Sequence, residues 1–228
     1  MDYNRTLFPD VPSSSIAQPA RPPGNAISVD ALKMPPRAVL EFQQALKDYK
    51  AGNMKGSVAH LEKSLAICPE FPEAHNTLGV MYAQLNEAEK ALEEFRKASA
   101  LNPKLVSSVN NQSAILLLMR RYPEAESAAR HALDLDPQHK STRYLLGRIL
   151  LTENQNTAET LELLRQSRND FPPARLFLSQ VLINRGEKEA ALQELNAYLE
   201  IPNAPQKEIA TKMISQLTAP PSLVLCLH

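Results

Sequence analysis

The stretch PEAHNTLGVMYAQLNEAEKALEEFRKASALNP, residues 72–103, decides the fold. Its apolar residues recur at intervals of three and four, once before and once after a polar break near Asn86. Such a pattern is typical of two amphipathic helices joined by a short turn. We therefore expect a helical hairpin, with one helix over about 72–84 and the other over about 87–101.

The small residues of this stretch predict where its two helices meet. Gly79 and Ala91 are expected at the crossing, since only small side chains fit between closely packed backbones. Leu78, Tyr82 and Phe95 are expected to fill the space on either side of the crossing. Substituting Gly79 by a large residue is therefore predicted to destabilise the hairpin.

The hairpin recurs along the chain. Pro69, Pro103 and Pro137 are evenly spaced, and each follows a similar segment: SLAIC, ASALN and ALDLD. The spacing from Pro69 to Pro103 is 34 residues, and we call it the repeat period. The breaks inside successive units fall near Gly52, Asn86 and Arg120, again one repeat period apart. A fixed period of this length is the signature of a stacked repeat architecture.

Composition agrees with an all-α fold and excludes some functions. The 228 residues include 6 Gly and 18 Pro, a balance that favours helices separated by proline breaks. Lys plus Arg equals Asp plus Glu at 25 each, so the chain lacks the basic surplus of a nucleic-acid binder. No stretch approaches the about 20 apolar residues of a membrane span.

The second unit resembles the tetratricopeptide repeat family in its pattern Leu78-Gly79-x-x-Tyr82, Ala91-x-x-x-Phe95-x-x-Ala98 and Asn102-Pro103. Other units are looser copies. The departures are Gln112, Ser113 and Ala129 in the third unit and Ser57 and Ser64 in the first. The resemblance implies an all-α, right-handed superhelical array of about five helix-turn-helix repeats with a C-terminal capping helix.

The extent of the repeats divides the chain into three parts. We expect a disordered, proline-rich arm over 1–35, a repeat domain over 36–217, and a short apolar tail over 218–228. The repeats are expected at about 38–71, 72–105, 106–139, 140–173 and 174–203, with the cap at 206–217. A cap is needed because nothing else buries the last apolar face of a repeat array.

The resemblance also implies a binding site. In this family the first helices of successive repeats line a concave groove that binds peptides. Its expected lining here is Phe42, Tyr49, Asn76, Val80, Asn110, Asn111, Tyr144 and Arg148. For Asn76 and Asn110, hydrogen bonding to neighbouring helices is an equal alternative. The carboxylate clamp of chaperone-binding members looks absent, since its positions hold Phe42, Leu46, Asn111, Ser141 and Leu145.

No residue pattern indicates catalysis, a metal site or a cofactor. The histidines lack metal-site spacing, and there is no phosphate loop or nucleophile elbow. We expect His75 in a core or half-buried position and His139 solvated in a turn between repeats. A solvated helix face is expected to carry Glu87, Glu89, Lys90, Glu93, Glu94, Arg96 and Lys97. The apolar run 115–119 is expected to be a buried first helix.

The function predicted from these features is an adaptor, not an enzyme, that holds a protein or peptide in its groove. Two alternatives remain: a self-associating scaffold that forms homo-oligomers, and the repeat portion of a larger exported bacterial protein. A cytoplasmic location is the default expectation. Residues 27–38 resemble segments that precede such repeats in secreted bacterial proteins, so the alternative is an exported or periplasmic protein whose native N-terminus is missing from this sequence. Cys68 and Cys226 are expected as free thiols, with one disulfide between them as the alternative.

Overall fold

The computed structural model describes residues 34–219, and every regular element among them is an α-helix. The all-α prediction is confirmed. The helices are α2 (Pro36–Lys50), α3 (Met54–Ile67), α4 (Pro72–Gln84), α5 (Ala88–Leu101), α6 (Val106–Leu118), α7 (Tyr122–Leu135), α8 (Lys140–Thr152), α9 (Ala158–Ser167), α10 (Ala174–Asn184), α11 (Lys188–Leu199) and α12 (Lys207–Thr218). Nearly all of the predicted arm and tail, residues 1–33 and 220–228, lies outside the described residues.

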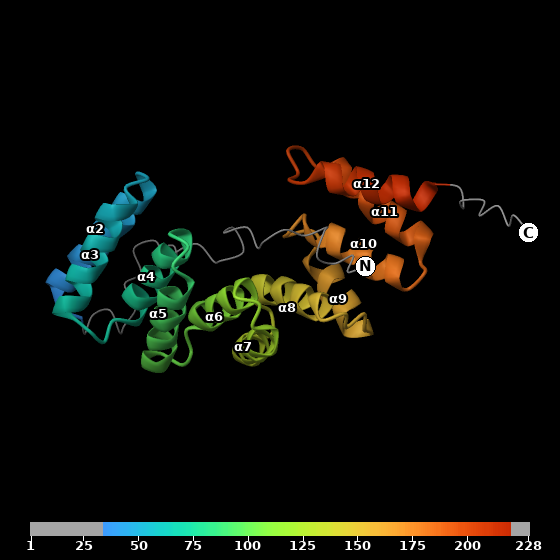
Figure 1. Ribbon diagram of the computed structural model, residues 1–228. Coiled ribbons are helices and arrows are strands. Elements are labelled where there is room, and N and C mark those ends of the chain that lie inside the picture. The colour runs from blue at the N-terminus through green and yellow to red at the C-terminus, as the bar shows by residue number, and fades with distance from the viewer. Residues whose placement is uncertain (1–33, 220–228) are drawn as a thin grey trace, which may run out of the picture. The chain divides into compact units, whose positions relative to one another are not determined.

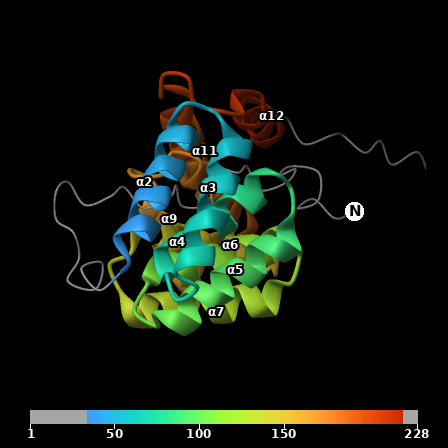
Figure 2. The same cartoon turned by 90° about the vertical axis from the view of Figure 1, so that its left-hand side faces the viewer.

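The chain forms two compact units, and the boundary between them falls within α8. In the first, which the structure describes over 34–145, α2 packs against α3, α4 against α5, and α6 against α7 (Figures 1 and 2). Each hairpin also packs on the next, through contacts of α3 with α4 and of α5 with α6. Consecutive helix pairs that contact only their neighbours are the arrangement of a repeat array.

Each hairpin turns through one residue with a left-handed backbone. Positive φ angles occur at Gly52, Asn86, Arg120, Asn154 and Gly186. The first three coincide with the predicted breaks, and Asn154 follows Arg120 by the same repeat period. A left-handed residue reverses the chain sharply, which brings the second helix of each pair back along the first.

The α4–α5 crossing is as close as the small residues predict. A Cβ atom added to Gly79 would lie 2.6 Å from the Phe95 ring and 3.1 Å from the Ala91 carbonyl oxygen. Phe95 and Ala91 are both fully buried. The prediction that Gly79 and Ala91 mark the helix crossing is therefore confirmed.

In the first and third hairpins, serines stand where the second hairpin has Ala98 and Gly79, and they bond to the paired helix. In the first hairpin the Ser64 hydroxyl donates to the carbonyl oxygen of Ala38 at 2.8 Å. In the third, the Ser113 hydroxyl donates to the carbonyl oxygen of Ala125 at 2.8 Å. A buried hydroxyl that finds a carbonyl acceptor costs little to bury, which explains why these departures from the repeat pattern are tolerated.

The second unit, described over 146–219, closes on a small apolar core. Gly147 of α8 faces Leu164 of α9, and α10 pairs with α11. Helix α12 packs on α11 and contributes Ala210 and Met213 to this core. The core consists of Leu176, Leu195, Tyr198, Ala210 and Met213. A helix thus lies where the sequence predicts a cap.

Burial along the first helices follows the sequence reading. Ile115, Leu116 and Leu117 are all buried, as expected for a first helix that packs on more than one side. No helix within residues 34–219 is long and apolar enough to cross a membrane.

Candidate functional site

An asparagine cluster joins the first helices of hairpins two and three. We define it as Asn76 on α4 with Asn110 and Asn111 on α6, all three buried. The Asn111 amide donates to Asn76 Oδ1 at 3.1 Å. Asn110 Oδ1 accepts a hydrogen bond of 2.9 Å from the Thr142 hydroxyl at the start of α8. Asn76 and Asn110 therefore do bond to neighbouring helices.

One atom of this cluster lacks a partner. The Nδ2 of Asn110 is buried and makes no hydrogen bond, although Asn110 is fully enclosed. A buried N–H donor without an acceptor costs roughly 1–3 kcal/mol, so a carbonyl brought to this atom would be stabilised. Because Asn110 is enclosed, a ligand reaches this atom only if the helices around it move apart.

A histidine extends the cluster and corrects one prediction. His139, expected to be solvated, is partly buried in the turn before α8, where its Nδ1 lies 2.6 Å from the Thr142 hydroxyl oxygen. Burial lowers the pKa of His139, and the charge of Asp136 offsets this only in part. The turn tucks His139 against α8, a contact that the helical period does not reveal.

The remaining predicted groove residues fall in three places. Phe42 packs on Phe71 with ring centroids 5.0 Å apart, and the Tyr49 hydroxyl accepts a 2.9 Å hydrogen bond from Gln84. Val80 is buried in α4 and Tyr144 in α8. Arg148 belongs to the second unit, where its guanidinium lies 5.1 Å from the Phe177 ring centre.

A buried acid–histidine pair joins α4 to α5. His75 Nδ1 lies 2.6 Å from Glu94 Oε2, and His75 Nε2 lies 2.9 Å from the carbonyl oxygen of Pro69. The prediction that His75 takes a core or half-buried position is confirmed. The prediction that Glu94 is solvated is wrong, because its side chain turns inward to His75 and is 8% exposed.

The pKa of Glu94 reflects this environment. Burial raises it, but hydrogen bonds from His75 and from Lys97, at 2.8 Å, outweigh burial and lower the pKa below 4.5. The Lys97 ammonium, which also contacts Glu93 at 2.7 Å, has its pKa raised to about 12. The charged side chains between these two helices are therefore paired with each other.

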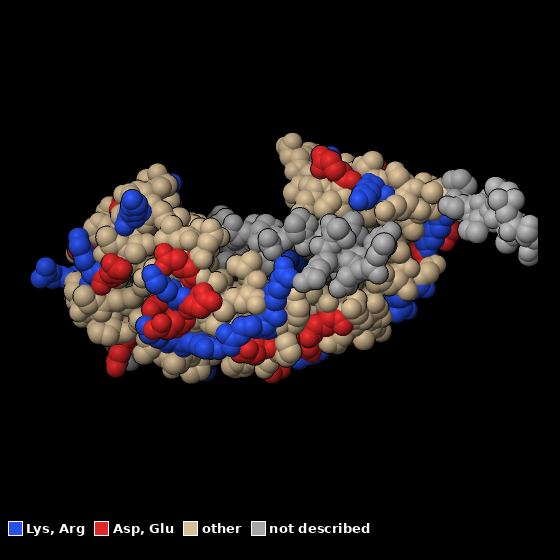
Figure 3. Space-filling view, in the orientation of Figure 1, with Lys and Arg blue, Asp and Glu red and all other residues tan. Residues whose placement is uncertain are grey.

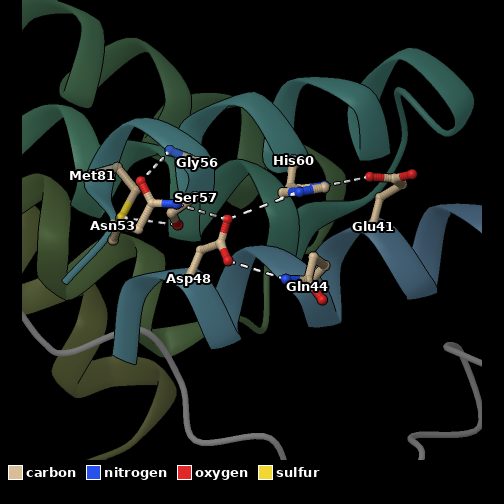
Figure 4. A network of polar contacts seen from close by, with 8 residues as sticks. All are labelled: Glu41, Gln44, Asp48, Asn53, Gly56, Ser57, His60 and Met81. Carbon is tan, nitrogen blue, oxygen red and sulfur yellow. Dashed lines mark hydrogen bonds and ion pairs between the residues drawn. The ribbon is translucent and has the colours of Figure 1, made fainter. Parts of the chain in front are cut away.

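The first hairpin contains the same kind of pair in reversed order. Glu41 of α2 contacts His60 of α3, with 2.6 Å between Oε2 and Nδ1 (Figure 4). Asp48 lies 3.9 Å from the other ring nitrogen of His60 and accepts hydrogen bonds from Gln44 and Asn53 (Figure 4). The hydrogen bond from His60 is the main cause that lowers the pKa of Glu41.

Neither pair follows from the repeat pattern, but a sequence signal exists. The partners are 19 residues apart in both hairpins, and the later pair follows the earlier one by one repeat period. Among residues 34–219, no group of three or more His, Cys, Asp or Glu side chains is placed to hold a metal ion.

Acidic and basic side chains lie interspersed on the face drawn in Figure 3.

Comparison with known proteins gives sequence relatives over parts of the chain. Family models of the tetratricopeptide repeat match residues 72–105 and residues 115–173. The type IV pilus assembly protein PilF of Pseudomonas aeruginosa is 33% identical over 84 residues, which is 37% of this chain and 33% of that protein. The CTR9 homolog of Arabidopsis thaliana is 47% identical over 55 residues, 24% of this chain and 5% of that protein. The matches thus span a third or less of these relatives.

Solved structures give the same fold over most of the chain. Pseudomonas aeruginosa PilF superposes with a TM-score of 0.69 at 23% identity, covering 80% of this chain and 84% of that one. YrrB, described as a TPR protein with an unusual peptide-binding site, gives a TM-score of 0.63 at 17% identity and covers 82% and 98%. The repeat matches, the hairpin order and these shared folds lead to one conclusion: the chain is a tetratricopeptide repeat protein.

Proposed function

We propose that this protein is an adaptor that binds an extended protein segment against the first helices of its repeats and carries out no chemistry of its own. The asparagine cluster is the centre of the proposed site. Its binding partner is a peptide main chain, because amide groups pair with peptide N–H and C=O groups whatever the side chains.

The observation that carries the proposal is the row of polar side chains on successive first helices: Asn76 bonded to Asn111, and Asn110 bonded to Thr142. The Nδ2 of Asn110 is left without a partner and is enclosed. Thr142 holds the Oδ1 of the same amide, which fixes the plane of the group before a ligand arrives. A donor held in place loses little entropy on binding, so a peptide carbonyl gains most of the hydrogen-bond energy once the surrounding helices move enough to admit it.

Apolar contacts add to this polar anchor. Phe42 and Tyr49 on α2 and Tyr144 on α8 offer aromatic side chains, which give contact area at low entropic cost. A small preformed site of this kind is expected to bind at about micromolar strength, near −8 kcal/mol.

Proteins with a similar fold support peptide binding. YrrB is described as having a peptide-binding site, and the first TPR domain of Spaghetti (RPAP3) is described as bound to the HSP90 peptide SRMEEVD. The second of these superposes on 52% of this chain with a TM-score of 0.51.

Binding of an identified partner tests the site. Proteins that co-purify with the chain are identified by mass spectrometry, and the affinity of a peptide from the partner is measured by fluorescence anisotropy. The double substitution Asn110→Ala plus Tyr144→Ala is expected to weaken binding at least about tenfold. Glu89→Ala, at an exposed position of α5, is the control and should bind like the wild type. Equal affinity of the double variant would refute this site.

A scaffold in a larger assembly is the second candidate. Two of the relatives carry assembly names: the pilus protein PilF, and anaphase-promoting complex subunit 7 of Dictyostelium discoideum, which is 23% identical over 151 residues. If the chain assembles with copies of itself, its mass in analytical ultracentrifugation will rise with concentration. A constant monomer mass favours the peptide-binding adaptor.

A further inference from the structure

A hollow of about 470 Å³ opens between α5, α6 and α7. We call it the α5–α6–α7 hollow. Its apolar wall includes Val109 and Leu116 of α6 and Ala128 of α7, and Arg96 and His131 lie at its polar edge. Residues 109, 112 and 116 follow one stripe of α6, whereas Asn110 and Ala114 follow another. The hollow is therefore separate from the asparagine cluster.

The hollow exists because the third hairpin lacks side chains that the second one has. One repeat period onward, His75 corresponds to Val109 and Glu94 to Ala128. In the second hairpin the His75–Glu94 pair occupies the space between the helices, with 2.6 Å between the bonded atoms. Replacing both side chains by smaller apolar ones empties the same space in the third.

Gln112 also leaves the hollow unfilled, because its side chain is bonded to α5. It stands one repeat period after Leu78, a buried core residue of the second hairpin. Its amide turns toward α5 and donates to the Ser99 hydroxyl at 2.8 Å and to the Phe95 carbonyl oxygen at 3.2 Å. The aliphatic side chain of Leu78 is thus replaced by an amide side chain that is hydrogen-bonded to α5.

The charges at the edge favour a carboxylate. The nearest carboxylate to Arg96 within the described part of the chain is that of Glu124, at 3.8 Å, and the Arg96 side chain is 55% exposed. Glu124 is itself held by Arg121, which donates to it at 2.6 Å and lowers its pKa. Glu124 is therefore held mainly by Arg121, which also interacts with Glu89, and Arg96 keeps only a long contact and an exposed guanidinium.

The second hairpin shows what fits such a site. There the equivalent space holds an aliphatic side chain, Leu78, and a carboxylate, Glu94, which is bonded by Lys97. His131 stands at the position of Lys97, and Arg96 adds a second cation. The chain's own filled site is thus a template for the ligand of its empty one.

We propose that the α5–α6–α7 hollow binds a segment of a partner protein that presents a large apolar side chain next to an aspartate or glutamate. The apolar side chain enters between Val109, Leu116 and Ala128. The neighbouring carboxylate pairs with Arg96 at the edge. The protein then has a second docking surface, independent of the proposed peptide site at the asparagine cluster.

A displayed library of random peptides tests this proposal. The library is selected on the full chain and counter-selected on Ala128→Leu, whose added side chain fills the hollow. Enriched peptides are expected to carry Leu, Ile, Met or Phe beside Asp or Glu. Binding of one synthesised peptide is then measured by anisotropy: Ala128→Leu should abolish it, Arg96→Gln should weaken it about tenfold, and Lys212→Ala, at an exposed position outside both proposed sites, should leave it unchanged.

Further variants separate the other outcomes. Arg96→Glu, at an exposed position, should keep the circular dichroism of the wild type and lose binding even if Ala128→Leu proves unstable. The proposal is overturned if no sequence is enriched, if enriched peptides lack an acidic residue, or if binding survives both Arg96 substitutions. It is also overturned if a peptide binds only after removal of residues 220–228, since the chain's own tail would then be the occupant.

Discussion

His75 Nδ1 and Glu94 Oε2 lie 2.6 Å apart, and they tie the first helix of the second hairpin to its second helix. Both side chains are largely buried, so water does not compete for the bond. The pair stands at the position where the first hairpin has Glu41 and His60 and the third has only Val109 and Ala128. The same repeat position thus holds an acid–histidine pair in the first two hairpins and no such pair in the third.

Removing the carboxylate of this pair should destabilise the protein. Glu94→Ala leaves the buried His75 nitrogen without its partner, and we expect a loss of about 1–3 kcal/mol in urea unfolding. Glu93→Ala, at the exposed neighbouring position, should cost little. Because the pKa of Glu94 is lowered, its stabilising effect is complete above pH 4.5 and is lost as the pH falls below that value. A difference between variant and wild type that grows on acidification would contradict this account.

Gly79→Leu should separate α4 from α5. Even a Cβ atom would lie 2.6 Å from the Phe95 ring, so a leucine forces the helices apart at an expected cost of about 1–3 kcal/mol or more. Glu93→Leu introduces the same side chain at an exposed site and is the control. Equal melting temperatures of the two variants in calorimetry would show that the crossing is not tightly packed.

The capping role of α12 is tested by Met213→Ala. The Met213 side chain is 2% exposed and packs in the core of Leu176, Leu195 and Tyr198, so truncation should cost about 2–5 kcal/mol. Lys212→Ala changes an exposed residue of the same helix and should be nearly neutral. Hydrogen exchange should show that Met213→Ala loosens α10 and α11. Unchanged exchange in these helices would mean that they do not depend on α12.

Stability should depend on pH through His139. Burial lowers the pKa of His139 below 6.5, so the unfolded chain binds the proton more readily than the folded one. The free energy of unfolding is therefore highest above pH 6.5 and falls as the pH drops below that value, by up to about 1.4 kcal/mol per pH unit. His139→Gln should remove this part of the dependence in urea titrations. If the variant and the wild type show the same slope, the imidazole is not the group responsible.

The fold could be predicted from the sequence because the helical period and the proline spacing act locally. Helix α4 spans Pro72–Gln84 as expected, and the break at Asn86 is a left-handed residue. The crossing at Gly79 follows from side-chain size alone. The helix bounds depend on residues a few positions apart, and the recurrence of the prolines shows that the same hairpin is repeated.

The polar contacts could not be predicted in the same way. A helical wheel assigns Glu94 to an outer stripe, but a long side chain can reach inward when a partner such as His75 lies on the facing helix. Likewise, Asn110 was expected either at a surface or between helices, and only the position of Thr142 shows where its oxygen is bonded. The hollow beside Ala128 does not follow from any single residue, because it results from side chains that are smaller in the third hairpin than in the second.

The left-handed turns at Asn86 and Arg120 bear on how this protein can be engineered. Both residues have φ of 60°, and they are separated by one repeat period. A duplicated copy of residues 87–120 inserted after Arg120 would begin and end with the same backbone geometry as the original. The array should accept such a cassette without a new junction, so its length, and with it the number of surfaces it offers, can be extended one hairpin at a time.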